Sequence, residues 1–237
     1  MRREPGHLLV QPDQQRAALG RALAIEPRVL LLDEPLSNLD TKLREAMRAE
    51  LKLIQRRTGL PILYVTHDQV EALSMSDRIA VMSAGRIHHL GPPEDIYDHP
   101  ATRFVLDFIG AVNHLPCTVL RRADGRLRLA LGGGVTEIEA PHPPQGTGEM
   151  ALAVRPEDVQ IATCRPDALT MDAPRARILL RAFVGDGFEY RLDLQGLILR
   201  ARTDKTLRLD EGTEVTLTLR RAVLLDADAG PESALTR

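Results

Sequence analysis

Two acidic residues and one histidine follow short apolar runs in the first third of the chain. Asp33 and Glu34 come directly after Val29–Leu32, and His67 follows Ile62–Val65. Open α/β sheets bind ligands at the carboxyl ends of their strands. An aspartate there can hold Mg²⁺, directly or through water, and a neighbouring glutamate can polarise an attacking water. The pattern therefore indicates metal-assisted phosphate hydrolysis, and the alternative is a buried strand that ends in two solvated acids.

Strand and helix signals alternate around these residues. The runs 29–32 and 62–65 suit strands that are buried on both faces of a sheet. Between them Asp40 is a good N-cap for a helix, while Gly59 and Pro61 fit its C-terminal end. One stripe of that helix carries Leu43, Met47, Leu51 and Ile54. Strand, helix and strand in this order predict a parallel α/β sheet.

Two further elements are predicted in the same part of the chain. Residues 13–24 are rich in Ala, Leu, Gln and Arg and favour a helix before the first strand. Residues 78–82 and 86–90 favour two strands, which Ser83-Ala84-Gly85 would join as a hairpin.

From residue 111 onwards the pattern changes to short extended runs separated by Gly, Asp and Pro. Ala123-Asp124-Gly125 and Gln195-Gly196 predict turns between them. The runs are Thr118–Arg122, Leu127–Leu131, Met150–Val154, Ile178–Val184, Tyr190–Leu194, Leu197–Ala201 and Val215–Leu219, with a final strand that ends at Asp226. Many short strands at such spacing predict a small β-barrel or sandwich. The chain is therefore expected to divide into residues 1–110 and 111–237.

The composition excludes some classes of function. With 43% hydrophobic residues and a formal net charge of -2, the 237-residue chain has no basic excess for nucleic acid. Its 3% aromatic content and lack of Trp also argue against an OB-type nucleic-acid binder. No apolar run approaches the roughly 20 residues that cross a bilayer. Cys117 and Cys164 form no CxxC pair, which favours free thiols in the cytoplasm over a single disulfide.

Further short motifs surround the acidic pair and the histidine in a definite order. Gln14-Gln15-Arg16 precedes them, Pro35–Asp40 follows Glu34, and Tyr64–Gln69 contains the histidine. The series continues through Glu71–Ser74, Ser76–Arg78, Gly85–Ile87 and Phe108–Gly110. Together these motifs resemble the second half of the nucleotide-binding domain of ATP-binding-cassette (ABC) importers. The resemblance implies an incomplete ABC-type P-loop NTPase fold, in which a sheet and helices form an α/β half-domain.

The resemblance also implies a role for each of five residues. Asp33 and Glu34 match the Walker B motif, so Asp33 would hold Mg²⁺ and Glu34 would act on the attacking water. His67 matches the switch histidine and would contact the γ-phosphate of ATP or that water. Ser37 and Asp40 match the D-loop, and Asp40 would act across a dimer interface. Glu34 and His67 are thus the predicted catalytic residues, and Ser37 and Asp40 the predicted nucleotide-binding ones.

The second half of the chain resembles the TOBE domain that follows the ATPase in many importers. The residues that carry this resemblance are Ala153–Val159, Phe183–Gly187 and the final strand to Asp226. It implies an OB-like β-barrel that packs against its partner's copy and can sense a solute or a regulatory protein. The alternative is a barrel that only aids dimerisation.

Two phosphate-binding motifs of the family are absent from the sequence. A Walker A loop ends in Gly-Lys, but none of the chain's three lysines, at 42, 52 and 205, follows a glycine. The Leu-Ser-Gly-Gly-Gln signature should occupy residues 9–13, where the sequence is Leu9-Val10-Gln11-Pro12-Asp13. Pro12 lacks a backbone donor, and Asp13 adds a negative charge where a phosphate should bind. We therefore expect a truncated form that neither binds nor hydrolyses ATP alone.

The expected function is that of the ATP-binding subunit of an importer that couples ATP hydrolysis to solute uptake. Its partners would be transmembrane permease subunits, a second copy or an intact ATPase subunit, and indirectly a periplasmic or extracellular solute-binding protein. It would then lie in the cytoplasm at the inner face of the membrane. The junction Phe108–Asn113 favours polyamine, iron(III) or phosphonate importers over sugar importers.

Two alternatives remain open at this point. The first is a non-enzymatic regulatory or solute-sensing TOBE module that pairs with an intact ATPase subunit. The second is that the open sheet, without the first half of its domain, is unstable, because unpaired apolar strand edges favour aggregation.

Overall fold

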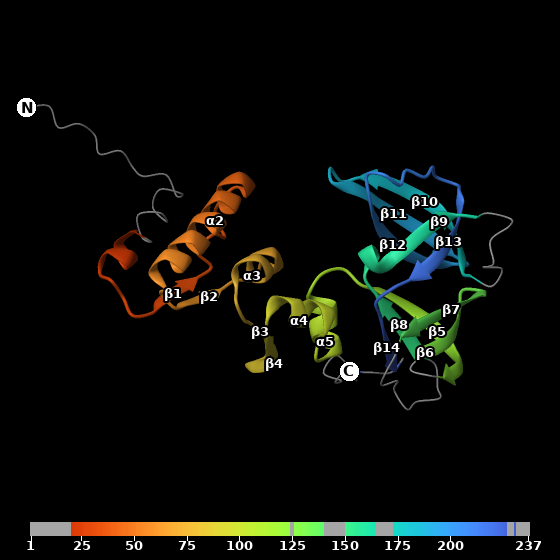
Figure 1. Ribbon diagram of the computed structural model, residues 1–237, viewed down its shortest axis with the longest axis horizontal. Coiled ribbons are helices and arrows are strands. Elements are labelled where there is room, and N and C mark those ends of the chain that lie inside the picture. The colour runs from red at the N-terminus through yellow and green to blue at the C-terminus, as the bar shows by residue number, and fades with distance from the viewer. Residues whose placement is uncertain (1–19, 124–125, 140–149, 165–172, 227–229, 231–237) are drawn as a thin grey trace, which may run out of the picture. The chain divides into compact units, whose positions relative to one another are not determined.

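The computed structural model describes residues 20–123, 126–139, 150–164, 173–226 and 230 (Figure 1). The chain forms two compact units, which we describe separately. The first runs to Ile79 and includes Gly91–Glu94, and the second comprises Ala80–Leu90 and the chain from Asp95. The motifs predicted at residues 9–16 and the turn at 124–125 lie outside the described residues. The assignment of residues 1–110 to half of a nucleotide-binding domain stays a prediction.

The first unit contains a parallel strand–helix–strand arrangement, as predicted. Its elements are β1 (Leu30–Asp33), α2 (Thr41–Thr58), β2 (Ile62–Val65) and α3 (Gln69–Met75), and residues 20–24 are helical. β1 and β2 pair in parallel, with Leu30 opposite Ile62 and Asp33 opposite Val65. The predicted first strand is therefore shifted by one residue, since Val29 precedes it.

Helix α2 begins and ends where the sequence predicts. The Asp40 carboxylate accepts a hydrogen bond from the Leu43 amide at 3.0 Å, which satisfies one of the free donors at the helix N-terminus. Gly59 adopts the left-handed conformation (φ 64°) at the other end. The apolar side of α2 packs on the sheet in a small core that comprises Leu36, Leu39 and Leu51, with Leu32, Leu43, Met47, Tyr64 and Met75 against it.

The prediction that both strands are buried on both faces is wrong. Leu31 is 70% exposed and Leu63 is 61% exposed, whereas their neighbours Leu32 and Tyr64 pack under α2. Because side chains alternate across a strand, α2 covers only one face of this two-stranded sheet. Among the described residues nothing covers the other face, on which the exposed Leu31 and Leu63 lie.

The second unit begins with a hairpin and two short helices. The predicted hairpin is confirmed as β3 (Ile79–Ser83) and β4 (Arg86–Gly91). Its turn places Ala84 and Gly85 at positive φ. The helices α4 (Pro93–Asp98) and α5 (Arg103–Phe108) were not predicted, because six residues are too few to show a helical period.

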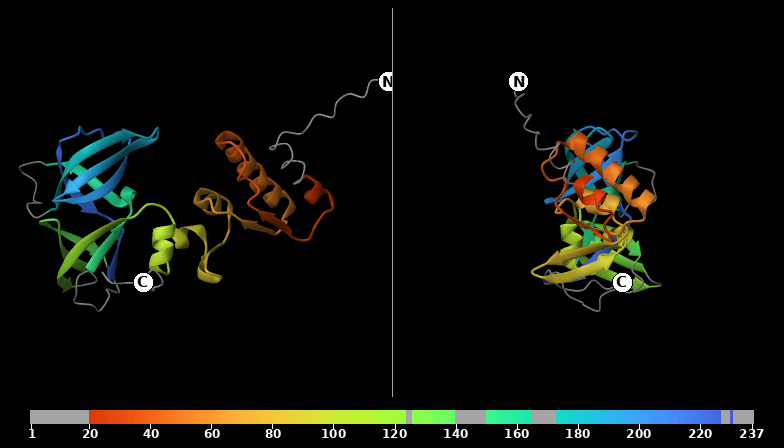
Figure 2. Two further views of the ribbon diagram at one scale, coloured as in Figure 1. Left: turned by 180° about the vertical axis from the view of Figure 1, so that it is seen from behind. Right: turned by 90° about the vertical axis from the view of Figure 1, so that its left-hand side faces the viewer.

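Two five-stranded antiparallel sheets form the rest of the second unit (Figure 2). One has the order β12-β11-β10-β13-β9, and the other the order β14-β8-β5-β6-β7. All the predicted runs overlap strands, but β7 and β9 were missed. The strands are β5 (Asn113–Ala123), β6 (Arg126–Leu131), β7 (Gly134–Glu139), β8 (Met150–Val154), β9 (Val159–Thr163), β10 (Arg175–Phe183), β11 (Gly187–Leu194), β12 (Leu197–Asp204), β13 (Glu214–Leu219) and β14 (Ala222–Asp226).

A single apolar core and one buried amide join these two sheets. The core contains side chains from both, among them Leu129, Leu152, Leu192 and Leu199. The side chain of Asn113 on β5 exchanges two hydrogen bonds with the backbone of Arg200 on β12, at 2.8 and 2.7 Å. Such a reciprocal pair fixes the position of β5 relative to β12, and thus of one sheet relative to the other. At the β11–β12 turn, Gln195 and Gly196 have φ values of 52° and 91°, as a two-residue hairpin turn requires.

Both cysteines are free thiols in the structure. Cys117 lies in the core between the sheets, where burial raises the pKa of its thiol to about 11. The predicted pair of free thiols is thus confirmed, and Cys117 acts as a small apolar residue.

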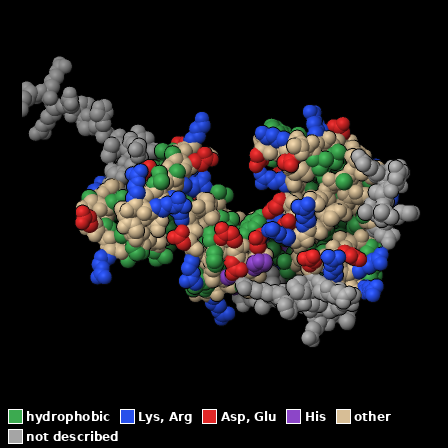
Figure 3. All heavy atoms as spheres, in the orientation of Figure 1, with side chains coloured by type: hydrophobic (Ala, Val, Ile, Leu, Met, Phe, Trp, Pro, Cys, Tyr) green, Lys and Arg blue, Asp and Glu red, His purple; other side chains and the backbone are tan. Residues whose placement is uncertain are grey.

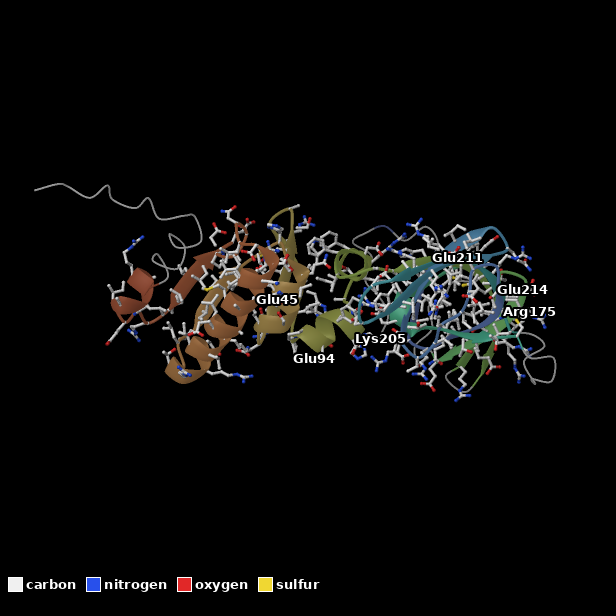
Figure 4. All side chains as sticks on the ribbon, turned by 90° about the horizontal axis from the view of Figure 1, so that it is seen from above. Glu45, Glu94, Arg175, Lys205, Glu211 and Glu214 are labelled. Carbon is white, nitrogen blue, oxygen red and sulfur yellow. The ribbon has the colours of Figure 1, made fainter. Side chains whose placement is uncertain are left out.

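Charged side chains of both signs are interspersed over the described surface that Figure 3 shows. Some form cross-strand pairs, such as Arg126 with Glu139 (3.7 Å) and Arg177 with Glu214 (3.8 Å). Glu214 and the neighbouring Arg175 are labelled in Figure 4. Exposed pairs of this kind typically contribute less than about 1 kcal/mol. The stability of the unit must therefore come mainly from its core and its buried polar groups.

Arg155 is the main buried charge of the second unit and is 5% exposed. It follows β8, and its guanidinium donates to the carbonyl oxygens of Tyr97, Ile109 and Ala111. The same group lies 4.0 Å from the centre of the Tyr97 ring, and the Tyr97 hydroxyl bonds to Glu157. Burial, followed by that bond, raises the pKa of Tyr97 to about 12. One arginine thus ties residues 97–111 to the sheets.

We expect Arg155→Ala to destabilise the second unit by about 3 kcal/mol, because it leaves several buried carbonyl groups without a donor. Chemical denaturation followed by circular dichroism measures the loss. Arg191→Ala, at an exposed position of β11, is the control and should change stability by less than about 0.5 kcal/mol. Equal effects of the two substitutions would contradict a structural role for Arg155.

Candidate functional site

The acidic pair and the histidine lie at the carboxyl ends of the two parallel strands. Asp33 is the last residue of β1, and His67 is the second residue after β2. The Glu34 amide donates to the Val65 carbonyl at 2.9 Å, which extends the parallel ladder by one bond beyond β1. The backbone of Glu34 then takes a positive φ of 44°, which is uncommon for residues other than glycine. The chain turns out of the sheet at this residue.

Glu34 and His67 form a direct pair. Nδ1 of His67 lies 2.9 Å from Oε1 of Glu34. Both side chains are solvent-accessible, Glu34 at 46% and His67 at 73%. The hydrogen bond to Glu34 and the negative charge of that residue raise the pKa of His67 above its ordinary value. The structure thus brings together the two residues predicted to be catalytic.

Ser37 and Asp40, the predicted nucleotide-binding residues, make local bonds. The Ser37 hydroxyl donates to the Glu34 carbonyl at 3.0 Å, and Asp40 caps α2. Both residues are exposed. Their contacts therefore define the shape of the loop that follows Glu34, and their roles toward a nucleotide stay predictions.

Asp33 offers one exposed carboxylate at the tip of β1. Within the described part of the chain, no three His, Cys, Asp or Glu side chains are grouped closely enough to hold a metal ion. Mg²⁺ is commonly bound by one or two carboxylates, with substrate phosphates and water as the remaining ligands. The donor set at Asp33 fits such a shared site and does not fit a site made of protein side chains alone.

A buried polar network lies behind His67, and the sequence analysis missed it. Glu71 on α3 is 3% exposed, and its Oε2 accepts hydrogen bonds from the Tyr64 hydroxyl and the Thr66 hydroxyl, both at 2.8 Å. Burial first, and then the bond to Glu71, raises the pKa of Tyr64 strongly. Asp68 caps α3 through the amides of Val70 and Glu71. Thr66 and Asp68, the neighbours of His67 in the chain, are thus both held by hydrogen bonds to α3.

One sequence signal pointed toward this network. Asp68 followed three residues later by Glu71 is the spacing of a capping box, in which the glutamate bonds back to the N-cap amide. In the structure the Asp68 amide instead donates to the Thr66 hydroxyl at 2.9 Å, and Glu71 turns inward. The spacing is thus a signal for the start of α3, but it does not indicate the direction of the Glu71 side chain.

Comparison with known families identifies the C-terminal part of the chain. Residues 152–225, which run from β8 to β14, match the family described as the TOBE domain. The chain carries a TOBE domain. The second unit therefore contains this TOBE domain together with the β3–β4 hairpin, α4, α5 and strands β5–β7.

The curated relatives of the TOBE-containing chain are importer proteins. The chain is 60% identical to a spermidine/putrescine import ATP-binding protein PotA of Ruegeria pomeroyi over 148 residues. This matched stretch makes up 62% of the chain and 40% of the relative. The chain is also 45% identical to a protein of the same name from Pseudomonas fluorescens over 225 residues. Here the matched stretch makes up 90% of the chain and 59% of the relative. The chain spans about half the length of the curated relatives it matches.

These matches confirm the predicted resemblance to an ABC importer ATP-binding protein with a C-terminal TOBE domain. Among solved structures, cbiO1 of Clostridium perfringens, described as part of the ABC transporter complex cbiONQ, is 32% identical and covers 39% of this chain and 37% of its own. The TM-score of this match is 0.37. The described helices include none that is both long and apolar enough to span a membrane.

We expect Glu34→Gln to lower the pKa of His67 toward its ordinary value of about 6.5, because the substitution removes the negative charge beside the imidazole. The pKa of His67 is higher in the folded chain than in the unfolded chain, so the pair stabilises the fold fully at pH values below the pKa of the unfolded chain. This contribution is lost as the pH rises through the pKa of His67 in the folded chain. Titration of the His67 resonances by NMR measures the shift. Glu45→Gln on α2 (Figure 4) is the matched control, and an equal shift there would refute the Glu34–His67 pair.

Proposed function

We propose that this chain is the ATP-binding subunit of an ABC importer, and that residues 1–110 form the C-terminal half of its nucleotide-binding domain. The observation that carries the proposal is the Glu34–His67 pair, 2.9 Å apart at the carboxyl ends of two parallel strands. The importer relatives support it, because they carry the name of ATP-binding proteins. Residues 111–237 would be the regulatory part, with an OB-like barrel that contains the TOBE domain.

ATP bound with Mg²⁺ would supply the γ-phosphoryl group that is transferred to water. Asp33 would contribute the single protein carboxylate to the metal, as its exposed position allows. Glu34 would accept a hydrogen bond from the attacking water, and His67 would hold Glu34 in place and donate to the phosphate. Ser37 and Asp40 would act toward a nucleotide at the surface of a second subunit.

The 237-residue polypeptide by itself is proposed to be inactive. Phosphate binding in P-loop NTPases requires backbone amides and a lysine that follows a glycine, and no Gly-Lys pair occurs in this sequence. An exposed pair of side chains at one edge of a two-stranded sheet cannot hold a triphosphate without such a loop. The phosphate-binding loop must therefore come from another polypeptide or from chain beyond this sequence.

The partners of the proposed subunit follow from the same assignment. It would bind transmembrane permease subunits at the cytoplasmic face of the membrane, and would pair with a second copy or with an intact ATPase subunit. A solute-binding protein outside the membrane would act on it only through the permease. The relatives are named for spermidine and putrescine, so we propose polyamines as the solute class, ahead of iron(III) and phosphonates.

A second candidate function is a non-enzymatic regulatory module. The observation that favours it is the large apolar core described in the second unit, where side chains of both five-stranded sheets pack together. The second unit would then bind a solute or a protein without using the residues of the first unit. In this role the chain would associate with an intact ATPase subunit and change its rate.

We expect the purified chain to show no ATP turnover, because its own residues do not cradle phosphates. The measurement is phosphate release with ATP and Mg²⁺, with Glu34→Gln as the control for contaminating ATPases. Turnover that disappears in Glu34→Gln would overturn the predicted inactivity and would show that the chain is an enzyme alone.

The importer assignment itself is tested by supplying the missing loop in trans. The N-terminal half of the Ruegeria pomeroyi relative is co-expressed with this chain, and the co-purified pair is assayed. We expect ATP hydrolysis to appear and to fall at least about 100-fold in Glu34→Gln and in His67→Ala. A stable pair that hydrolyses nothing would contradict the catalytic proposal, and stimulation of an intact ATPase subunit by the chain would favour the regulatory one.

A further inference from the structure

Arg44, in the first turn of α2, reaches two loops that the chain separates by more than 20 residues. Its Nη2 donates to the Leu39 carbonyl at 3.2 Å, and its Nη1 donates to the Asp68 carboxylate at 3.4 Å. Leu39 belongs to the Ser37–Asp40 loop, and Asp68 closes the Thr66–Asp68 loop, which carries His67. One planar guanidinium therefore contacts both loops at once.

The third nitrogen of the same group faces Glu71. Nε of Arg44 lies 3.9 Å from the Glu71 carboxylate, and it is buried without a hydrogen-bond partner among the described residues. Glu71 already accepts the two bonds from Tyr64 and Thr66 described above. The Glu71 carboxylate is buried and the Arg44 side chain is partly buried, so their opposite charges attract each other with reduced screening by solvent, and each helps to hold the other in place.

We propose that Arg44 is a positioning residue that locks the Ser37–Asp40 loop to the Thr66–Asp68 loop, so that both loops move as one. The inference rests on the proposed function, because those loops carry the residues assigned to the nucleotide. It goes beyond that function by naming the link through which a change at Asp40, on the subunit surface, reaches His67. Lysine cannot replace arginine here, because one ammonium group cannot direct donors to three separate elements in a fixed plane.

The lock is tested first by amide hydrogen exchange in the full chain. The Leu43 amide reports on the Ser37–Asp40 loop through its bond to Asp40, and the Val70 amide reports on the Thr66–Asp68 loop through its bond to Asp68. We expect Arg44→Gln and Arg44→Lys to accelerate exchange at both amides by about tenfold, the loss expected for a charge-assisted hydrogen bond. The Gly59 amide, at the far end of α2, should not change.

Arg57→Gln is the matched control. Arg57 lies on the last turn of the same helix, is exposed, and contacts neither loop. If Arg44 only stabilises α2, its substitution will accelerate hydrogen exchange at the Gly59 amide as well as at the Leu43 and Val70 amides. That outcome would overturn the proposed lock, and so would faster hydrogen exchange at the reporter amide of one loop without a change at the other.

A double-mutant cycle across the two loops separates positioning from general stability. Asp68→Asn keeps an N-cap residue for α3 but removes the charge that Arg44 contacts. We expect Asp68→Asn to accelerate exchange at Leu43, on the other loop, and to have no such effect when Arg44 is already Gln. Independent effects of the two substitutions at Leu43 would show that no link runs through Arg44.

A spectroscopic measurement distinguishes failure of this inference from failure of the proposed function. The imidazole ¹⁵N shifts of His67 at fixed pH report whether Nδ1 is hydrogen-bonded to Glu34. We expect the bonded shift in the wild type and its loss in Glu34→Gln and Arg44→Gln. If the wild type lacks it, the catalytic pair is wrong, and the exchange cycle still decides the role of Arg44. If Arg44→Gln retains it, the pair stands and Arg44 does not position His67.

Discussion

The parallel register between β1 and β2 determines where Glu34 and His67, the residues of the candidate site, lie relative to each other. Asp33 is opposite Val65, and the Glu34 amide bonds to the Val65 carbonyl. The residues that follow each strand therefore leave the sheet at the same height, which is why an acid and an imidazole separated by 33 positions meet at 2.9 Å. A slip of one residue would turn every side chain of a strand to the opposite face. The packing of Leu32 and Tyr64 under α2 opposes such a slip.

The exposed pair depends on buried groups that take no part in it. Glu34 and His67 lie in solvent, where an ion pair contributes little to stability. Beneath them Glu71, Tyr64 and Thr66 form bonds that would be costly to break, because a buried polar group without a partner loses its full solvation. The exposed Glu34–His67 pair is thus placed next to a buried polar network and stays accessible to solvent.

Local features of the fold could be predicted from the sequence, and features set by distant contacts could not. The cap at Asp40, the left-handed Gly59 and the turn at Gln195-Gly196 depend on a few neighbouring residues, and the structure confirms all three. The exposure of Leu31 was mispredicted because it depends on what covers the second face of the sheet, which no local pattern encodes. At the site, the acidic pair and His67 were found from their positions after apolar runs. Arg44 was missed because its partners lie on other elements.

The large apolar core and the residues proposed to act on a nucleotide lie in different units. The second unit buries a large core in which both of its five-stranded sheets take part, and Arg155 ties the preceding helical segment to it. Among the described residues of the first unit, Leu36, Leu39 and Leu51 form a small buried cluster, yet this unit carries all the residues proposed to act on a nucleotide. An apolar sheet face is exposed there, and burial of apolar area is the main favourable term in folding. The strands that hold Glu34 and His67 therefore gain less from apolar burial than the sheets of the second unit do.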